Sequence, residues 1–335
     1  MSDIIIKADG LTKKFPLDSG FFARQDRFVY AVNDVSFEIG RGKTYGLVGE
    51  SGSGKTTAAR LLIQMYKEDS GKILFDGKDV GAFSKHELKT YREKVKYIFQ
   101  DPGKSLNPRM NIGGILTSAY RFSSLWPGRA KAEDEAAELL EEVGLDPKDI
   151  ERRPAEFSGG QRQRISIARA LIMKPEVLIC DEIVSALDVS VQGQILNLLI
   201  DLKKRRNLSF LFIAHDLRVS CYFCDTIGVM YSGMIMEEAP AENLYKNALH
   251  PYTNLLFSSN DGKSIESRNT AVSEIRRSAV SEIRDSAVSE IITVLEPLKS
   301  CPFAPRCPKA TEKCRAELPA LKEIEPGHKV RCHLI

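Results

Sequence analysis

GESGSGKTT, at residues 49–57, is the stretch that decides the fold. A short apolar run, Thr44–Val48, precedes it, and a helical pattern begins near Lys55. The apolar face of that helix is expected to consist of Ala58, Leu61, Leu62 and Met65. A glycine-rich turn between a strand and a helix lets backbone N–H groups surround phosphate oxygens at the positive end of the helix. The GxxxxGK[ST] spacing in this context therefore predicts a phosphate-binding loop.

The loop residues have distinct expected parts in binding a nucleoside triphosphate. Lys55 is expected to reach the β- and γ-phosphates, and the Thr56 hydroxyl to ligate Mg²⁺. The remaining expected contacts to the nucleotide come from Gly49, Glu50, Ser51, Gly52, Ser53, Gly54 and Thr57. By itself the loop indicates nucleotide binding only, which leaves kinases and GTPases open.

Strand and helix patterns alternate around this loop. Strand-like composition occurs at 4–6, 35–39, 177–180 and 208–214, and helical periodicity lies between the later strands. This alternation predicts an α/β fold whose mostly parallel sheet is covered by helices. Residues 105–156 differ, because Pro and Gly precede a charged amphipathic stretch. We expect them to form a helical subdomain inserted into the α/β core.

The overall composition excludes several classes of partner. Among 335 residues, 48 are basic and 45 acidic, and the formal net charge of +3 argues against nucleic acid or an anionic membrane surface. No apolar run approaches the ~20 residues that cross a bilayer. The first residues, 1–7, lack the basic and apolar parts of a signal peptide. We therefore expect the chain to stay in the reducing compartment where it is made, with unpaired cysteines.

A carboxylate pair follows an apolar strand later in the chain. Residues 177–180 lead into Asp181, expected to hold Mg²⁺ through water, and Glu182, placed to polarise an attacking water. Two acidic residues after a strand are common, so the segment FSGGQRQR at 157–164 decides the interpretation. It opens a helix on a serine and two glycines, which predicts a second phosphate site at a helix N-terminus.

FSGGQ at 157–161 resembles the signature of ABC ATPases, usually LSGGQ, with Phe157 in place of Leu. Further family elements follow in order. Gln100 is similar to the Q-loop glutamine that contacts Mg²⁺ or water and senses a transmembrane partner, and His215 to the switch histidine at the γ-phosphate. Residues 185–188 resemble the D-loop. Phe15 is similar to the aromatic residue that stacks on adenine, with core packing and Tyr30 as alternatives.

This resemblance covers about residues 3–250. It implies a P-loop NTPase fold with a RecA-like core, an N-terminal β subdomain and a helical subdomain. It also implies that two subunits enclose two ATP molecules head to tail, so that each site joins one chain's phosphate loop to the other chain's signature. The residues expected to reach the neighbour's ATP are Ser158, Gly159, Gly160, Gln161 and Asp188. Glu182, His215 and Gln100 are the implied catalytic residues, and Thr56, Gln100 and Asp181 the implied Mg²⁺ site.

Composition changes beyond residue 250. Three copies of an eight-residue unit, beginning AVSEI, occupy 271–294, and we expect residues 251–296 to be a linker. Residues 297–335 are expected to form a separate small module with Cys301, Cys307, Cys314 and Cys332 in the spacing C-x5-C-x6-C-x17-C. Four thiols in a tail too small for its own core indicate a metal centre. Zinc suits four thiolates but lacks its usual C-x2–4-C spacing here, and an iron–sulfur cluster suits them too.

The tail resembles that of the ATPases of oligopeptide and dipeptide ABC importers, some of which carry a [4Fe-4S] cluster. HPYT at 250–253, NPRM at 107–110 and residues 184–192 resemble the same group, and Phe157 with Cys180 is similar to its F-type ATPase. Ile183 departs from the family, which usually has Pro there. Cys180, Cys221 and Cys224 are interpreted as core cysteines.

The resemblance implies a peripheral ATPase on the cytoplasmic face of the plasma membrane. Its partners would be two transmembrane permease subunits, a paralogous ATPase subunit and, indirectly, an extracellular substrate-binding protein, with no nucleic acid. Oligopeptides or dipeptides are the expected cargo. The alternatives are nickel or oligosaccharides, a soluble ABC ATPase not engaged in transport, and an iron–sulfur protein that binds ATP without turnover.

Overall fold

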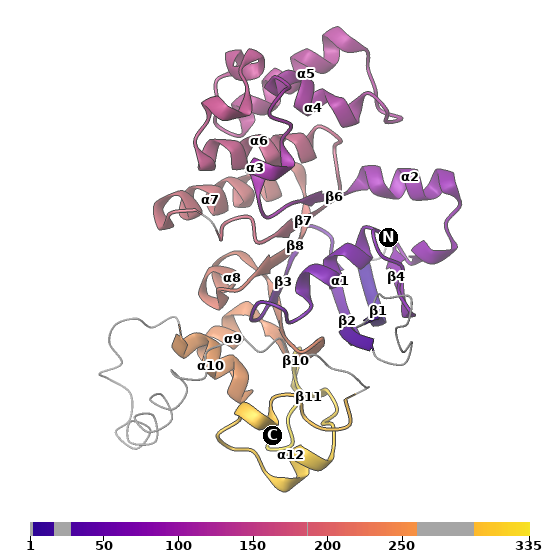
Figure 1. Ribbon diagram of the computed structural model, residues 1–335, viewed down its shortest axis with the longest axis vertical. Coiled ribbons are helices and arrows are strands. Elements are labelled where there is room, and N and C mark those ends of the chain that lie inside the picture. The colour runs from indigo at the N-terminus through magenta and orange to yellow at the C-terminus, as the bar shows by residue number, and fades with distance from the viewer. Residues whose placement is uncertain (1–2, 17–27, 186, 260–297) are drawn as a thin grey trace.

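The computed structural model describes residues 3–16, 28–185, 187–259 and 298–335 (Figure 1). The octapeptide repeat at 271–294 lies outside these residues. Figure 1 shows an elongated molecule with a helical part at one end, the main sheet in the middle, and the C-terminal tail at the other end.

The main sheet has eight strands in the order β11-β12-β10-β9-β3-β8-β7-β6. Its parallel part consists of β6 (Val95–Ile98), β7 (Val177–Asp181), β8 (Ser209–Ala214), β3 (Thr44–Val48) and β9 (Thr226–Tyr231). β10 (Met234–Pro240) runs antiparallel to β9. Every residue of β3, β7 and β8 is buried, as expected of parallel strands covered on both faces. This confirms the predicted α/β architecture.

A second, antiparallel sheet forms the N-terminal part. Its order is β2 (Phe28–Gly40), β1 (Ile4–Pro16), β4 (Ser70–Phe75) and β5 (Lys78–Asp79). β1 and β2 extend beyond the apolar runs at 4–6 and 35–39, and register shifts interrupt their pairing. Helix α1 (Lys55–Leu62) follows the phosphate loop. The expectation for Met65 is wrong: the helix ends before this residue, whose side chain is 50% exposed.

The helical part between 102 and 171 lies at one end of the molecule, next to the β6 edge of the sheet (Figure 1). It contains α3 (Pro102–Ser105), α4 (Ile112–Tyr120), α5 (Arg129–Glu142) and α6 (Gly159–Leu171), with short 3-10 turns at Pro147–Glu151 and Pro154–Glu156. Helix α2 (Lys85–Lys94) precedes β6. The remaining helices are α7 (Val189–Arg206), α8 (Leu217–Phe223), α9 (Ala241–Lys246), α10 (Pro251–Ser259) and α12 (Glu312–Ala316).

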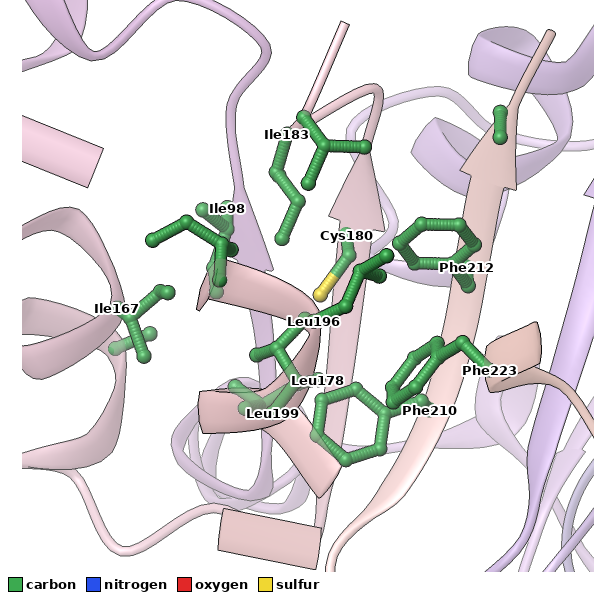
Figure 2. Packing of buried hydrophobic residues seen from close by; sticks show 14 of the residues in the cluster. Ile98, Ile167, Leu178, Cys180, Ile183, Leu196, Leu199, Phe210, Phe212 and Phe223 are labelled. Carbon is green, nitrogen blue, oxygen red and sulfur yellow. The ribbon is translucent and has the colours of Figure 1, made fainter. Parts of the chain in front are cut away.

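One apolar cluster joins the helices to the sheet (Figure 2). Cys180 is fully buried in it, and Phe223 lies edge-on to Phe210 and Phe212 at centroid distances of 5.3 and 5.0 Å. Cys224 is also buried, and Cys221 is half-buried. Burial raises the pKa of the Cys180 and Cys224 thiols, so they stay neutral. The core interpretation of these two residues is therefore confirmed.

The C-terminal tail is not separate from the main sheet, contrary to expectation. β12 (His328–Val330) pairs with β10, and β11 (Lys322–Glu325) pairs with β12. Phe303 is buried and lies 5.4 Å from Tyr231 and 5.3 Å from Tyr252, measured between ring centroids. The physical reason is size, because a tail this short gains a core only by packing on a larger one.

Buried polar contacts fix the tail in place. The His328 Nε2 atom lies 2.8 Å from the Glu237 carboxylate, with both side chains almost fully buried. The His250 ring lies against Phe303, and its Nδ1 atom accepts the Tyr252 N–H at 3.0 Å. His250 is therefore buried as a neutral imidazole between α10 and the tail.

This arrangement predicts a pH dependence of stability. Burial lowers the pKa of His250 to about 4, below its ordinary value of 6.5. Its stabilising effect is fully present above pH 6.5 and is lost as the pH falls toward 4, where protonation favours the unfolded chain. The full shift corresponds to about 3 kcal/mol. In His250→Gln, urea unfolding at 25 °C should lose much less stability between neutral pH and pH 5 than in wild type. An equal pH dependence in both proteins would contradict the assignment.

Candidate active site

The phosphate loop is closed over its own lysine. Lys55 is buried, and its Nζ atom donates to the carbonyl oxygens of Gly49 at 2.7 Å and Glu50 at 2.8 Å, and to Ser53 Oγ at 3.3 Å. Burial lowers the pKa of Lys55, and the nearby carboxylates of Glu182, Asp181 and Glu50 act in the opposite direction. A cation is thus held at the start of α1, at the positive end of the helix.

Two glycines make this loop conformation possible. Gly54 has φ +105°, and a Cβ atom there would lie 2.0 Å from the Ala31 carbonyl oxygen. At Gly49 a Cβ atom would lie 2.1 Å from the Met230 carbonyl oxygen. Both contacts are to backbone atoms that cannot move aside, so only glycine fits at either position.

The carboxylate pair lies beside this loop. Asp181 is buried at the end of β7, where its Oδ1 atom accepts the Thr56 hydroxyl at 3.1 Å and its Oδ2 atom accepts the Tyr97 hydroxyl. Glu182 has the left-handed φ of +49°, and its N–H donates to the Ile213 carbonyl at 3.0 Å. A non-glycine residue in this region is uncommon and is held there only by its surroundings.

Two further predicted site residues, Gln100 and His215, lie beside the Glu182 carboxylate. Gln100 Nε2 donates to Glu182 Oε2 at 2.9 Å, and His215 Nδ1 lies 3.9 Å from that oxygen. The turn that follows is also closed, since the Ser185 N–H and hydroxyl both donate to the Glu182 carbonyl, at 3.1 and 2.8 Å. Ile183, which replaces the usual Pro, is buried under this turn. The structure thus brings Thr56, Asp181, Glu182, Gln100 and His215 together.

The signature segment opens helix α6 with a reciprocal cap. Ser158 Oγ accepts the Gln161 N–H at 3.3 Å, and Gln161 Oε1 accepts the Ser158 N–H at 2.9 Å. A Cβ atom on Gly160 would lie 2.6 Å from Val191 in α7, so the helix start packs on the helix that Asp188 precedes. Among the described residues, the hydrogen bonds of this cap stay within it and do not reach the phosphate loop.

Phe15 lies at the end of β1. Its ring packs edge-on to Tyr66 at 5.3 Å between centroids, and Lys13 Nζ lies 5.6 Å from its centroid. The rival Tyr30 lies opposite Lys14 on β2. These contacts show Phe15 half-buried, and its stacking on adenine stays a prediction.

The four tail thiols are neighbours without converging on one point. Cys314 interacts electrostatically with Cys301, Cys307 and Cys332. In the part of the chain that the structure describes, no three His, Cys, Asp or Glu side chains form a group that could hold a metal ion. Burial raises the pKa of Cys301, Cys307 and Cys332. At Cys314 burial is outweighed by hydrogen bonds, chiefly from the Thr311 hydroxyl, which lower the pKa of the thiol.

Three residues at this site were missed by sequence reasoning. Tyr97 holds Asp181, Tyr252 accepts the Glu50 N–H at 2.9 Å, and Arg306 contacts the Glu50 carboxylate. Tyr97 could have been found from the sequence, because it lies in a predicted strand that could be expected to pair with the strand ending at Asp181. Arg306 had no such signal, because its partner is 256 positions away.

A cavity of about 610 Å³ lies between this site and the helical part. Its lining includes Thr56, Gln100 and Asp181 from the core and Ser118 and Arg169 from α4 and α6. Phe99, 39% exposed, lies at its wall.

No helix among the described residues has the length and apolar character needed to span a membrane.

Comparison with solved proteins places this architecture. A bacterial ABC transporter cassette solved as a dimer is 26% identical, with a TM-score of 0.60 over 71% of this chain and 99% of that chain. A dimeric post-hydrolysis cassette bound to ADP and Pi is 25% identical, with a TM-score of 0.61 and the same coverage. Residues 32–185 match the ABC transporter family. The fold is that of an ABC-type, P-loop ATPase.

The particular family follows from the full-length relatives. Residues 236–314 match the oligopeptide/dipeptide transporter C-terminal region. The probable peptide ABC transporter ATP-binding protein y4tS of Sinorhizobium fredii is 41% identical over 100% of this chain and 91% of its own length. The oligopeptide transport ATP-binding protein AppF of Bacillus subtilis is 43% identical over 99% and 98%. The chain belongs to this family of ABC transporter ATP-binding proteins.

Proposed function

We propose that this chain hydrolyses ATP at the face of the cell membrane to drive uptake of oligopeptides or dipeptides through separate permease subunits. The ATPase activity is supported by one observation: five predicted site residues lie together beside the phosphate loop, namely Thr56, Asp181, Glu182, Gln100 and His215. The cargo rests on the relatives, which are named as peptide or oligopeptide transport proteins. Those names do not favour nickel, oligosaccharides or a role outside transport.

The contacts support a division of labour for phosphoryl transfer to water. Lys55 and the loop N–H groups would bind the phosphates, and Thr56 and Asp181 would hold Mg²⁺, with Gln100 beside them. Glu182 would accept the proton of the attacking water, with His215 near the γ-phosphate. The left-handed backbone of Glu182 aims its carboxylate at this place, and the Ile213 carbonyl fixes that backbone. Catalysis then consists mainly of positioning and charge neutralisation.

The signature requires a second ATPase chain. Ser158 opens α6 with a free positive helix end, yet its hydrogen bonds stay local among the described residues. We infer that Ser158, Gly159, Gly160 and Gln161 bind the ATP held by a partner's phosphate loop. The dimeric cassettes to which this chain is similar support that arrangement. A paralogous ATPase is the proposed partner.

A transmembrane partner would contact the cavity beside Gln100. The exposed Phe99 and the neighbouring Phe122, which is 76% exposed, offer apolar surface there. A segment bound in this place would touch the residues directly after β6, which include Gln100, and through Gln100 it would be linked to Glu182. Binding at the cavity could thereby be communicated to the hydrolytic carboxylate. This proposal locates the chain on the cytoplasmic face of the membrane, with an extracellular binding protein as an indirect partner.

We also propose that the tail binds a [4Fe-4S] cluster through Cys301, Cys307, Cys314 and Cys332. The donor set fits, because the thiols are neighbours and their sulfurs accept backbone N–H groups, such as that of Leu334 at Cys332. Four cysteine thiolates are a ligand set that a [4Fe-4S] cluster takes, and Cys301, Cys307, Cys314 and Cys332 would supply it here. The cluster would join the turns of the tail that carry these cysteines, around Ala304–Arg306 and Glu312–Ala316.

The role proposed for Glu182 predicts a loss of hydrolysis when its carboxylate is replaced. Glu182→Gln should keep ATP binding and lose hydrolysis at this chain's site by about 10²–10⁴-fold, because a positioned base is lost. The measurement is the steady-state ATPase rate of the assembled transporter beside nucleotide binding, with the partner's site separately disabled. Turnover close to wild type would overturn the assignment of Glu182.

The composite site predicts that hydrolysis depends on a partner ATPase chain. The isolated chain should be largely monomeric and a poor ATPase, because its signature has no phosphate to bind. Activity should rise when the paralogous ATPase and the permease are added. The measurement is ATPase rate against protein concentration, alone and with partners. A full rate that does not depend on concentration in the isolated chain would contradict the shared site, whereas full activity with self-association would replace the heterodimer by a homodimer.

The proposed cluster predicts the colour and the metal content of the protein. Anaerobically purified protein should be brown and contain about four iron atoms and about four sulfides per chain, as one [4Fe-4S] centre requires. Cys314→Ser should bleach it, whereas the matched variant Cys221→Ser, outside the tail, should not. Colourless protein with stoichiometric zinc would show that the metal is wrong.

A further inference from the structure

Arg306 in the tail forms an ion pair with Glu50 in the phosphate loop. Arg306 Nη1 donates to Glu50 Oε2 at 2.7 Å, and Nη2 donates to Glu50 Oε1 at 2.9 Å. This two-pronged geometry is the strongest that a guanidinium and a carboxylate form. Arg306 ends the turn Ala304–Arg306, directly before Cys307, and Glu50 is the second residue of the phosphate loop. The pair therefore joins the Cys-rich tail to the nucleotide site.

Aromatic rings orient the guanidinium. Its central carbon lies 5.7 Å from the ring centroid of Tyr231 and 5.9 Å from that of Phe303. Those rings pack on each other and on Tyr252. The same Tyr252 accepts the Glu50 N–H through its hydroxyl at 2.9 Å. Glu50 is thus held at its backbone by α10 and at its side chain by the tail.

Glu50 also contributes to the position of Lys55. The Glu50 carbonyl accepts from Lys55 Nζ at 2.8 Å, next to the Gly49 carbonyl at 2.7 Å. A displacement of Glu50 would shift these carbonyls and the N–H groups that follow. Because Arg306 and Glu50 are 39% and 40% exposed, removing the pair leaves no buried unpaired charge. Its loss should alter the loop far more than the fold.

We propose that Arg306 is a positioning residue of the phosphate loop, through which the C-terminal tail sets the affinity of this chain for ATP. The inference rests on the proposed nucleotide site. Without Arg306 the loop samples more conformations, and ATP binding must restrict them again. The expected effect is on ATP affinity and not on the hydrolytic step. Glu182 interacts with Gln100 and with His215, and neither Glu182 nor His215 forms a hydrogen bond or ion pair with Arg306 or Glu50 among the described residues.

The test measures ATP affinity of the full chain by calorimetry. Arg306→Ala should weaken binding by about three- to tenfold, equal to about 0.7–1.4 kcal/mol. Arg306→Lys should bind ATP with an affinity between those of wild type and Arg306→Ala, because lysine keeps the positive charge but cannot form the two parallel hydrogen bonds. Arg315→Ala is the matched control, being an exposed arginine next to Cys314 in the same tail, and should bind as wild type. In the assembled transporter, Arg306→Ala should raise the KM for ATP and change kcat less than about twofold.

Charge exchange separates positioning from damage to the tail. Glu50→Arg and Arg306→Glu should each weaken ATP binding, and the double variant should recover most of the loss, because the pair reforms in reverse. Additive losses in the double variant, or an Arg306→Ala chain that binds ATP as wild type does, would overturn the proposal. Failure of the wild-type chain to bind ATP would instead refute the proposed function.

Discussion

The parallel register of β6, β7, β8 and β3 is the constraint on which the rest of the structure depends. Val48 pairs with Ala214, Asp181 with Ile213, and Ile98 with Cys180, so these four strands end at one edge. The phosphate loop, the carboxylate pair, His215 and Gln100 each follow one of these strand ends. Residues 82 and 125 positions apart, Gln100 with Glu182 and Thr56 with Asp181, meet because the backbone ladder aligns them, in the place where α/β sheets bind ligands.

The same edge explains why Glu182 tolerates an uncommon backbone. Its N–H continues the ladder to the Ile213 carbonyl while its φ of +49° turns the chain away from the sheet. The cost of such a conformation is of the order of 1 kcal/mol or more, and the surrounding bonds offset it. Ser185 donates twice to the Glu182 carbonyl, so the turn holds even with Ile183 in the place of Pro. The carboxylate is therefore placed by its backbone rather than by its own rotamer.

The parts of this molecule that sequence predicted are those with local signals. The GxxxxGK[ST] loop, the buried strand before Asp181 and the cap at Ser158 each depend on residues within a few positions of one another. The prediction that Met65 lies on the apolar face of α1 was wrong, because the helical period continues in the sequence after the helix has ended at Leu62. The docking of the tail failed because it depends on pairs such as Glu237 with His328, 91 positions apart. Nothing near either residue indicates its partner.

The tail's contacts follow from its size and bear on the meaning of the phosphate loop. A segment that cannot bury a core of its own packs on existing apolar surface, here the rings of Tyr231 and Tyr252 beside the loop. Lys55 is bonded to two loop carbonyls, and binding a phosphate would exchange those bonds for new ones. The net gain depends on how well the loop keeps its shape during that exchange. In this family member, that shape is determined partly by residues more than 200 positions after the loop, so the nucleotide site extends beyond its motifs.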